Sequence, residues 1–492
     1  MPKQNSHPHS IDLLAIAHQS MIEAGFVPDF SAAVKLEVDS LTRKPPELSA
    51  AAGRDLRALL WSSIDDSKSR DLDQIEYAEA LSNGDTRLLI GIADVDTFVP
   101  IHSATDAHAD ENCTSVYAGV KTFPMLPEQL STDLTSLVAA EDRLTVVTEM
   151  VVAADGTVKT TEFYPAIVNN HAKLAYESVG NWLDGKANVP DAVKNVPGLE
   201  AQIRLQDETA NRLGELRRQK GAIELGTIQA TPVVDDRGQV KELRVIEQNS
   251  ARDLIANFMI AANVEMAEFL EAKGGPSLRR VVRTPKYWPR IVEIAAELGE
   301  KLPATPDSRA LADFLARRKK ADPLHFPDLS LAVVKSLGPG EYSVQVPGEP
   351  GEGHFGLAVQ DYTHSTAPNR RYADVVTQRL VKAALSGQSQ PYAIDELKRI
   401  AEHCTDREDA ARKVERKMRK VASAVLLKDR IGDQFEAIVT GVTPKGTFAR
   451  VLNPPVDGRV MRGERGLRVG DKVRVRLLAT DPERGFIDFA RA

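Results

Sequence analysis

The sequence predicts an α+β protein in three parts: a helical module at residues 1–50, a large mixed domain at 51–428, and a five-stranded β-barrel at 429–492. Strand-like and helix-like patterns alternate over residues 54–427, with no linker long enough to divide this region. From Gly432 onward the pattern changes to short runs separated by Gly, Pro and Asp turns, which is typical of a small barrel. At 492 residues, the chain is long enough for two or three domains.

The composition excludes several classes of protein. Hydrophobic residues make up 42% and charged residues 27% of the chain, as in soluble globular proteins, and no apolar run approaches the ~20 residues of a membrane helix. The first ten residues lack the apolar core of a secretory signal, and Cys113 and Cys404 have no metal-site or redox spacing. We therefore expect a cytoplasmic protein without membrane association. The net charge of -7 indicates that any contact with nucleic acid uses local basic tracts.

The first 50 residues predict two short helices. Apolar side chains follow a helical spacing over residues 10–24, before a break at Gly25 and Pro28. Ser31 is a candidate N-cap for a second helix. The pair could form a helix-turn-helix, but it lacks a basic recognition face, so we favour a packing or lid role. The Pro- and Ala-rich stretch 44–52 is expected to be a linker.

The middle of the chain contains clear strand and helix patterns. Strands are expected at residues 86–94 and 144–152, the latter before a turn at 154–156. Helices are expected at 253–273, 372–385 and 406–427, where apolar side chains recur with helical spacing. The Gly- and Pro-rich stretch 338–356 is expected to be a loop with no phosphate-binding role, because its glycines do not join a strand to a helix.

The barrel prediction rests on five β-rich runs, FEAIVTGV, GTFARVL, DGRVM, DKVRVRLLA and FIDFA. Phe435 and Phe448 could supply stacking faces for nucleic-acid bases, with nearby arginines as phosphate partners. Alternatively, both rings belong to the barrel core. We expect the core position for Phe435, and both positions stay open for Phe448, which follows a glycine turn.

The densest acidic cluster places Asp65, Asp66, Asp71 and Asp73 within nine positions, directly before Gln74. Neighbouring carboxylates repel by ~1 kcal/mol in water and ~4 kcal/mol near a protein surface, so such a cluster favours full solvation or a bound cation. Carboxylate oxygens suit Mg²⁺. In an extended segment, Asp71 and Asp73 would face the same side on either side of Leu72. On spacing alone, a solvated acidic loop is an equally good interpretation.

A second cluster, TAPNRRY at residues 366–372, lies directly before an amphipathic helix. Arg370 and Arg371 at a helix N-terminus could form an anion site, because backbone N–H groups and the helix dipole add to the guanidinium donors. Alternatively, they are surface arginines paired with nearby carboxylates. A cation site and a phosphate site in one domain together indicate phosphoryl chemistry.

In order and content, these motifs resemble the RNB catalytic domain of the ribonuclease II and ribonuclease R family over roughly residues 54–427. The barrel resembles the OB-fold RNA-binding domain repeated in the largest ribosomal small-subunit protein, notably at GTF (446–448) and VGDKV (469–473). The supporting segments of the large domain are GIADV (91–95), FPMLP (123–127), KLAY (173–176), MIAAN (259–263) and HFGL (354–357).

The resemblance implies 3′-to-5′ hydrolysis of single-stranded RNA to nucleoside 5′-monophosphates at a magnesium site, with Mn²⁺ as a substitute. Asp65, Asp71 and Asp73 match the family's metal-site aspartates, which position Mg²⁺ and the attacking water. Gln74 occupies the next metal-site position. Arg370 matches the arginine that holds the scissile phosphate.

The resemblance also implies a set of RNA contacts. Tyr117 matches a tyrosine that clamps the terminal nucleotide, and Tyr176 one that packs on bases further up the channel. Glu415 aligns with a glutamate near the 3′ nucleotide. Without the family, both tyrosines would be core or rim residues, and Glu415 an exposed helix partner of Arg419. Arg371 and Phe448 complete the expected RNA-binding residues.

The sequence departs from the family pattern at several positions. Gln74 replaces a fourth aspartate; its amide can ligate Mg²⁺ but brings no charge and cannot act as a base, although Asp66 or Asp94 could compensate. Leu225 replaces a phenylalanine that stacks on the end of the RNA, a contact that contributes ~1–3 kcal/mol. Near Ala256 and Asn257 the usual glutamate is absent. The residues before the large domain are also too few for the family's paired cold-shock barrels.

We therefore expect a magnesium-dependent exoribonuclease of RNA turnover that acts as a monomer on single-stranded RNA. The alternative is an RNA-binding protein in which Gln74 marks impaired catalysis. An acid that completes the Mg²⁺ shell in place of Gln74 would favour the enzyme. An endonuclease or a DNA-acting enzyme is a third possibility. The family's preference for RNA, through contacts to the 2′-OH, argues against DNA.

Overall fold

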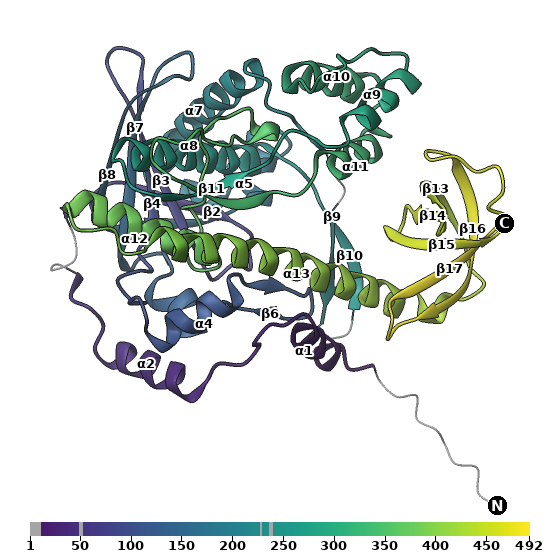
Figure 1. Cartoon of the computed structure of the whole chain (residues 1–492), viewed down its shortest axis with the longest axis horizontal. Coiled ribbons are helices and arrows are strands. Elements are labelled where there is room, and N and C mark those ends of the chain that lie inside the picture. The colour runs from purple at the N-terminus through teal and green to yellow at the C-terminus, as the bar shows by residue number, and fades with distance from the viewer. Residues whose placement is uncertain (1–10, 49–52, 227–228, 236–239) are drawn as a thin grey trace, which may run out of the picture.

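The computed structural model describes residues 11–48, 53–226, 229–235 and 240–492 (Figure 1). Its architecture is the predicted one, with N-terminal helices, a mixed domain and a closed five-stranded barrel. The extreme N-terminus and the end of the predicted linker, 49–52, lie outside the described residues. Within the described ranges, no helix combines the length and apolar character needed to cross a bilayer.

The two N-terminal helices are α1 (Leu13–Glu23) and α2 (Ala32–Arg43), and Ser31 caps α2 as predicted. They pack against different helices of the mixed domain. Glu23 of α1 forms a 3.0 Å ion pair with Lys417, while the Glu37 carboxylate of α2 accepts hydrogen bonds from the first backbone N–H groups of α4 (Ala104–Asn112). This arrangement agrees with a packing role for the two helices.

The centre of the mixed domain is a six-stranded sheet. Its strand order is β1 (Arg54–Asp55), β8 (Val158–Ala175), β2 (Trp61–Asp65), β3 (Gln74–Ala80), β4 (Thr86–Ala93) and β7 (Asp142–Val152). The long strand β8 pairs in parallel with β1 and β2 and antiparallel with β7. The last strand of the order, β7, is therefore also hydrogen-bonded to β8. The predictions for β4 and β7 are confirmed.

Helices bury both faces of this sheet. One face packs with α12 (Tyr372–Ser386) and the other with α5 (Tyr176–Leu183), α7 (Leu199–Gln219) and α8 (Ser250–Ala272). The remaining elements of the domain are β5 (Val116–Tyr117), β6 (Thr122–Phe123), a π-helix (Leu130–Leu134), α6 (Asp191–Lys194), β9 (Gln229–Val234), β10 (Val240–Ile246), α9 (Trp288–Glu297), α10 (Ser308–Ala321), α11 (Phe326–Leu337) and a 3₁₀ turn (Phe355–Leu357).

The prediction of a loop over 338–356 is partly wrong. This stretch contains β12 (Glu341–Gln345), which pairs antiparallel with β11 (Ser277–Val281). Its backbone hydrogen bonds come from a strand sixty or more positions away, so the local Gly- and Pro-rich composition did not reveal the strand.

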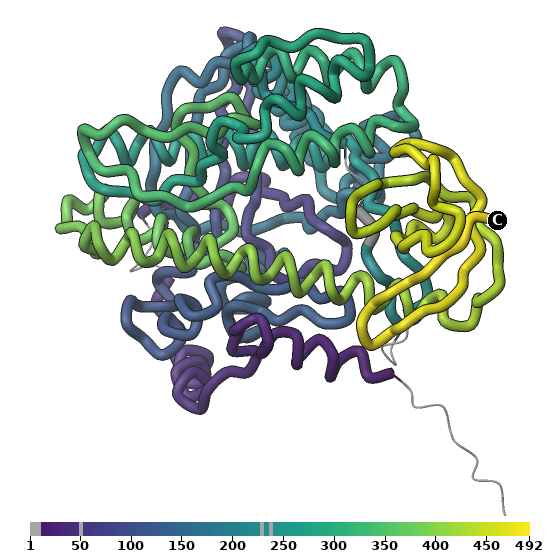
Figure 2. Tube along the Cα trace, turned by 45° about the vertical axis from the view of Figure 1, so that its right-hand side comes forward, coloured from purple at the N-terminus to yellow at the C-terminus, as the bar shows by residue number. Residues whose placement is uncertain are grey.

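The longest helix, α13 (Ile394–Leu427), joins the domain to the barrel. It starts before the predicted helix 406–427 and ends as predicted. Figures 1 and 2 show α13 crossing the molecule, with the barrel at its C-terminal end. After a 3₁₀ turn (Lys428–Arg430), the barrel comprises β13 (Gln434–Thr443), β14 (Gly446–Val451), β15 (Val456–Arg462), β17 (Phe486–Arg491) and β16 (Lys472–Asp481), in spatial order. These strands coincide with the five predicted runs.

Candidate active site

A cavity of about 520 Å³ lies between the central sheet, α8 and the segment before α12. Most of the predicted site residues line it, although they come from distant parts of the chain. They are Asp65, Asp71, Asp73, Gln74, Tyr117, Tyr176, Arg370 and Arg371. Glu415 lines an adjoining cavity, and Phe448 lies in the barrel.

The acidic loop connects two neighbouring strands, because β2 ends at Asp65 and β3 begins at Gln74. Leu72 is 1% exposed and packs in the core, and its backbone N–H donates to the Ser136 hydroxyl at 2.9 Å. With Leu72 turned inward, Asp71 and Asp73 both line the cavity, as their alternation about Leu72 predicts.

Asp73 is the most deeply buried acid of this loop, with 3% of its surface exposed. Its carboxylate accepts a 2.9 Å hydrogen bond from the backbone N–H of Asn369 and lies 3.4 Å from Nε of Arg370. Burial raises the pKa of Asp73 to about 7, although the Arg370 charge and the Asn369 hydrogen bond both oppose this rise.

Asp65 and Asp71 are held by other contacts. The Asp65 carboxylate accepts from the backbone N–H of Asp66 at 2.6 Å and from the Ser69 hydroxyl at 3.0 Å, while burial raises its pKa. The Tyr117 hydroxyl donates to the Asp71 carboxylate at 3.5 Å. The loop thus presents its acids from different directions to one cavity.

Gln74 carries no charge into this site. Its side-chain N–H₂ donates to the Ile64 carbonyl at 3.4 Å. The two acids that could compensate for it are both engaged by cations: Asp66 pairs with Arg252 at 2.7 Å, and Asp94 pairs with Lys382 at 2.8 Å.

The two arginines before α12 have different surroundings. Arg371 forms a 2.7 Å ion pair with Asp374, which is fully buried. The Arg370 side chain is 44% exposed, and its guanidinium lies beside the Asp73 carboxylate in the wall of the cavity. Both guanidiniums line the cavity, and Arg371 does so while it pairs with a carboxylate of its own helix.

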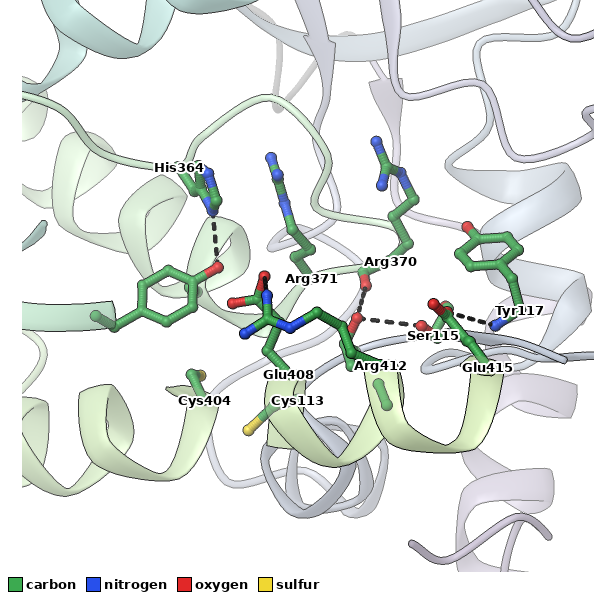
Figure 3. Close-up of a pocket in the computed structure, with 14 residues that line it drawn as sticks. Cys113, Ser115, Tyr117, His364, Arg370, Arg371, Cys404, Glu408, Arg412 and Glu415 are labelled. Atoms are coloured by element: carbon green, nitrogen blue, oxygen red, sulfur yellow. Dashed lines mark hydrogen bonds and ion pairs between the residues drawn. The ribbon is translucent and has the colours of Figure 1, made fainter. Parts of the chain in front are cut away.

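Backbone contacts connect Arg370 to the segment that carries Tyr117. The Arg370 carbonyl accepts a 3.0 Å hydrogen bond from the Ser115 N–H, and the Glu415 carboxylate accepts from the Tyr117 N–H at 3.1 Å. Figure 3 shows the contact between Glu415 and Tyr117 beside a second cavity of about 240 Å³, with Arg370 and Arg371 extending away from α13. Glu415 therefore contacts Tyr117 rather than forming the predicted surface pair with Arg419.

The far side of the main cavity carries Tyr176. The Arg252 guanidinium lies 4.3 Å from the centre of the Tyr176 ring while it pairs with Asp66. Burial raises the pKa of the Tyr176 hydroxyl, so the ring stays neutral. A neutral aromatic ring with one arginine beside it is a suitable stacking surface for a base.

The other departures from the family pattern can also be placed. Leu225 is partly buried against the core formed by α9, α10 and α11. Ala256 lines the main cavity, and Asn257 is buried and accepts a hydrogen bond from Arg217. Neither Leu225 nor Ala256 can supply the aromatic ring or carboxylate expected from the family.

In the barrel, Phe435 is 5% exposed and belongs to the core, as predicted. Phe448 is only partly buried and alternates along β14 with the buried Thr447 and Ala449. Its ring therefore lies on the outer side of the barrel, away from the core.

Sequence reasoning missed Glu76 of β3. This side chain is completely buried, and neither of its carboxylate oxygens has a hydrogen-bond partner. One feature of the sequence could have revealed it. Glu76 is a charged residue among apolar residues of the same strand, and the nearby Ile75 and Ala78 are fully buried. Among the described residues, no three His, Cys, Asp or Glu side chains lie close enough together to enclose a metal ion.

The fold and the cavity define a class: an α+β domain with buried acids facing an arginine, joined to an OB-fold barrel. Residues 53–387 match the RNB domain model, and residues 433–492 match the RNase II-type exonuclease C-terminal S1 domain. The first match covers more than half of the chain, so this protein belongs to the RNB family.

Known proteins of this class are similar over most of the chain. Ribonuclease R 1 of Lactococcus lactis subsp. lactis (strain IL1403) is 29% identical over 97% of this chain and 60% of that protein. A structure of Mycoplasma genitalium RNase R in complex with ribose methylated single-stranded RNA superposes with a TM-score of 0.87, at 25% identity over 98% of this chain and 78% of the other. Yeast Ssd1, a pseudonuclease, shares the fold with a TM-score of 0.71 at 16% identity, over 94% of this chain and 57% of the other. The chain spans about 60% of the length of the first curated relatives that it matches.

Proposed function

We propose that this protein is a magnesium-dependent 3′-to-5′ exoribonuclease that hydrolyses single-stranded RNA to nucleoside 5′-monophosphates in RNA turnover. The observation that carries the proposal is the cavity in which Asp65, Asp71 and Asp73 lie opposite Arg370. The similarity to ribonucleases R, one of them solved with single-stranded RNA, supports the choice of substrate.

The donors around the cavity suit a hydrated Mg²⁺. They are carboxylate and amide oxygens, and Mg²⁺ commonly keeps several waters while it binds one or two carboxylates and a substrate phosphate. Such a site does not need three protein acids in direct contact. Asp65, Asp71, Asp73 and Gln74 would hold the ion, directly or through its bound waters, and Mn²⁺ would substitute for it. The ion would polarise the scissile phosphate and lower the pKa of a bound water.

The side chains have distinct roles in this proposal. The exposed Arg370 guanidinium donates to the scissile phosphate and stabilises the negative charge that develops on its oxygens. Asp73, whose pKa is raised by burial in the absence of a metal ion, accepts a proton from the attacking water at a carboxylate oxygen. Tyr117 packs on the 3′-terminal nucleotide, and Tyr176 packs on a base further along the RNA.

The catalytic unit is the domain at 51–428, and the barrel at 429–492 binds RNA that has not yet reached the cavity. Phe448, on the outer side of the barrel, provides a stacking surface. The two described helices of the N-terminal module, α1 and α2, pack against the catalytic unit. The protein acts as a cytoplasmic monomer.

The second candidate function is an RNA-binding protein without catalysis, which Gln74 favours. An uncharged amide in place of a carboxylate removes one negative charge from the cation site. The fold does not decide between the two, because a pseudonuclease shares it.

The test is incubation of the protein with 5′-labelled single-stranded RNA and Mg²⁺, beside Asp73→Asn and an EDTA control. We expect products that shorten from the 3′ end to a small remnant, and none in either control. Intact RNA with retarded mobility would instead support the RNA-binding protein. Cleavage of an RNA with a blocked 3′ end would indicate an endonuclease.

A further inference from the structure

Arg252 is a cation of the main cavity to which the proposed reaction assigns no role. It lies in the first turn of α8 and lines the cavity with Ala256 and Met259, which share its face of the helix. Its side chain is 19% exposed, and its guanidinium lies against the Tyr176 ring. The cavity therefore carries a positive charge beside Tyr176, in addition to the charge of Arg370.

A single side chain fixes this arginine relative to the Tyr176 ring. The side-chain oxygen of Asn249 accepts a 3.0 Å hydrogen bond from the Arg252 backbone N–H. The N–H₂ group of Asn249 donates to the Tyr176 carbonyl, also at 3.0 Å. The ring adds a cation–π contact, with the guanidinium 4.3 Å from its centre. Arg252 is therefore held in place before any ligand binds, which reduces the conformational entropy that binding would lose.

The carboxylate that pairs with Arg252 is held less firmly than the arginine. The Asp66 side chain is 60% exposed and lies 2.7 Å from Nη2 of Arg252. Within the described ranges of the chain, the Asp66 carboxylate has no other hydrogen-bond or ion-pair partner. Water solvates the charge of such an exposed carboxylate, so an ion pair of this kind contributes little to stability. Asp66 can therefore leave Arg252 with little loss of free energy.

The guanidinium also has an unused donor. Nε and Nη2 lie on the same edge of an arginine side chain and can donate two parallel hydrogen bonds to a phosphate. Asp66 accepts from Nη2, while Nε is buried and has no partner among the residues that the structure describes. Two phosphate oxygens would satisfy both donors, where Asp66 satisfies one.

The charges of the cavity favour a phosphate at this position. An RNA strand that reaches Arg370 brings its phosphates past the aspartates of the cavity, and like charges repel unless cations lie along the path. Arg371 is already paired with the buried Asp374. A nucleotide whose base packs on Tyr176 brings its backbone phosphate to the part of the cavity where Arg252 lies. Arg252 is thus the cation available for a second phosphate.

We propose that Arg252 binds a backbone phosphate of the RNA beside the base on Tyr176, and that Asp66 occupies Arg252 only while RNA is absent. The inference rests on the proposed function in taking single-stranded RNA as the ligand. It depends neither on hydrolysis nor on a bound cation, and it adds a second phosphate contact to that of Arg370.

The test begins with the affinity of the full-length protein for a 5′-fluorescein-labelled single-stranded RNA, measured in EDTA by fluorescence anisotropy at several salt concentrations. We expect Arg252→Ala to weaken binding about tenfold or more, the size of one hydrogen bond to a charged group. The slope of log affinity against log salt concentration should become less steep by about 0.7, the contribution of one phosphate contact on a single strand.

The matched control is Arg204→Ala. Arg204 also lies over an aromatic ring, that of Trp182, and also pairs with a carboxylate, that of Glu200, but it does not line the cavity. Its removal should leave both the RNA affinity and the salt slope at their wild-type values. Arg252→Lys keeps the charge but loses the edge with two donors, so it should recover only part of the affinity.

Asp66→Asn separates phosphate binding from a structural role of the ion pair. The substitution removes the carboxylate that competes for Arg252, so it should strengthen RNA binding about threefold, the equivalent of an exposed ion pair. The same substitution in Arg252→Ala should have no such effect, which excludes a general change in charge. A gain in affinity cannot result from a folding defect.

The phosphate itself is located with 2′-O-methyl RNAs that carry one uncharged methylphosphonate linkage at successive positions from the 3′ end. The wild type should lose affinity at one linkage besides the scissile one. Arg252→Ala should be insensitive to the methylphosphonate at that linkage.

The outcomes are distinct. Equal RNA affinity and salt slope for Arg252→Ala and the wild type would overturn the inference and leave a structural ion pair. Weaker binding by Asp66→Asn would overturn it as well, even if the wild type degrades RNA. A wild type that binds RNA through Arg252 but leaves it intact with Mg²⁺ would support the inference and refute the exonuclease.

Discussion

Replacing Arg370 by alanine tests the arrangement of acids and arginine most directly. Its guanidinium is 44% exposed, faces the cavity and lies 3.4 Å from the Asp73 carboxylate. In the proposed reaction it contacts the scissile phosphate. The variant therefore removes a phosphate donor and the charge that opposes the high pKa of Asp73.

The expected magnitude follows from these contacts. A hydrogen bond to a charged group contributes about 1.5–3 kcal/mol, and a guanidinium commonly makes two with a phosphate. A loss of about 3 kcal/mol corresponds to a decrease of about a hundredfold in kcat/KM. Without Arg370, the pKa of Asp73 should rise further, because its main counter-charge is lost. The acid limb of the pH–rate profile should then shift to higher pH.

The assay is single-turnover cleavage of 5′-labelled single-stranded RNA between pH 5.5 and 9. Arg370→Lys keeps the positive charge but cannot donate two parallel hydrogen bonds to a phosphate. It should therefore return the acid limb of the pH–rate profile close to its wild-type position, while the cleavage rate stays below that of the wild type. The control is Arg419→Ala, which removes an exposed arginine of α13. A rate for Arg370→Ala within about threefold of this control would refute the role of Arg370, since one lost charged contact alone should exceed it.

Three further predictions concern stability, pH and RNA affinity. Lys382→Met leaves Asp94 buried without its cation and should lower the free energy of unfolding by about 3 kcal/mol, measured in urea; unchanged stability would contradict this. The Asp73 pKa rises on folding from 3.8 to about 7, so the unfolded state loses its proton first, and stability in EDTA should fall as pH rises through this window; Asp73→Asn should abolish that contribution. Phe448→Ala should weaken RNA binding by about 1–3 kcal/mol without changing the melting temperature, whereas Phe435→Ala should destabilise the barrel; equal RNA affinity for Phe448→Ala and the wild type would exclude stacking there.

The parts of the fold that sequence predicted are those whose pattern is local. The barrel strands and β4 alternate between buried and exposed positions or form short apolar runs. This pattern can be recognised in the sequence of each strand without knowing the strand that it pairs with. β12 was missed because its pairing with β11 depends on a distant segment. The prediction also placed the start of α13 at residue 406, and so missed its first three turns.

The candidate site shows the same division. The alternation about Leu72 correctly predicted that Asp71 and Asp73 face one cavity. The pairing of Asp66 with Arg252 joins residues 186 positions apart, and no local pattern reveals it. Glu76 was missed because an acid in a strand is usually exposed, and only the register with β2 places it inside.

The continuity of α13 limits how this molecule can change over evolution. One helix of 34 residues carries Glu415, which holds the Tyr117 backbone, and then continues to the barrel. Each residue inserted into an α-helix rotates everything beyond it by about 100° and advances it by about 1.5 Å. A single insertion after Glu415 would turn the barrel to another side of the catalytic domain. Insertions or deletions that preserve the orientation of the barrel must therefore add or remove nearly whole helical turns. This makes α13 intolerant of smaller changes in length.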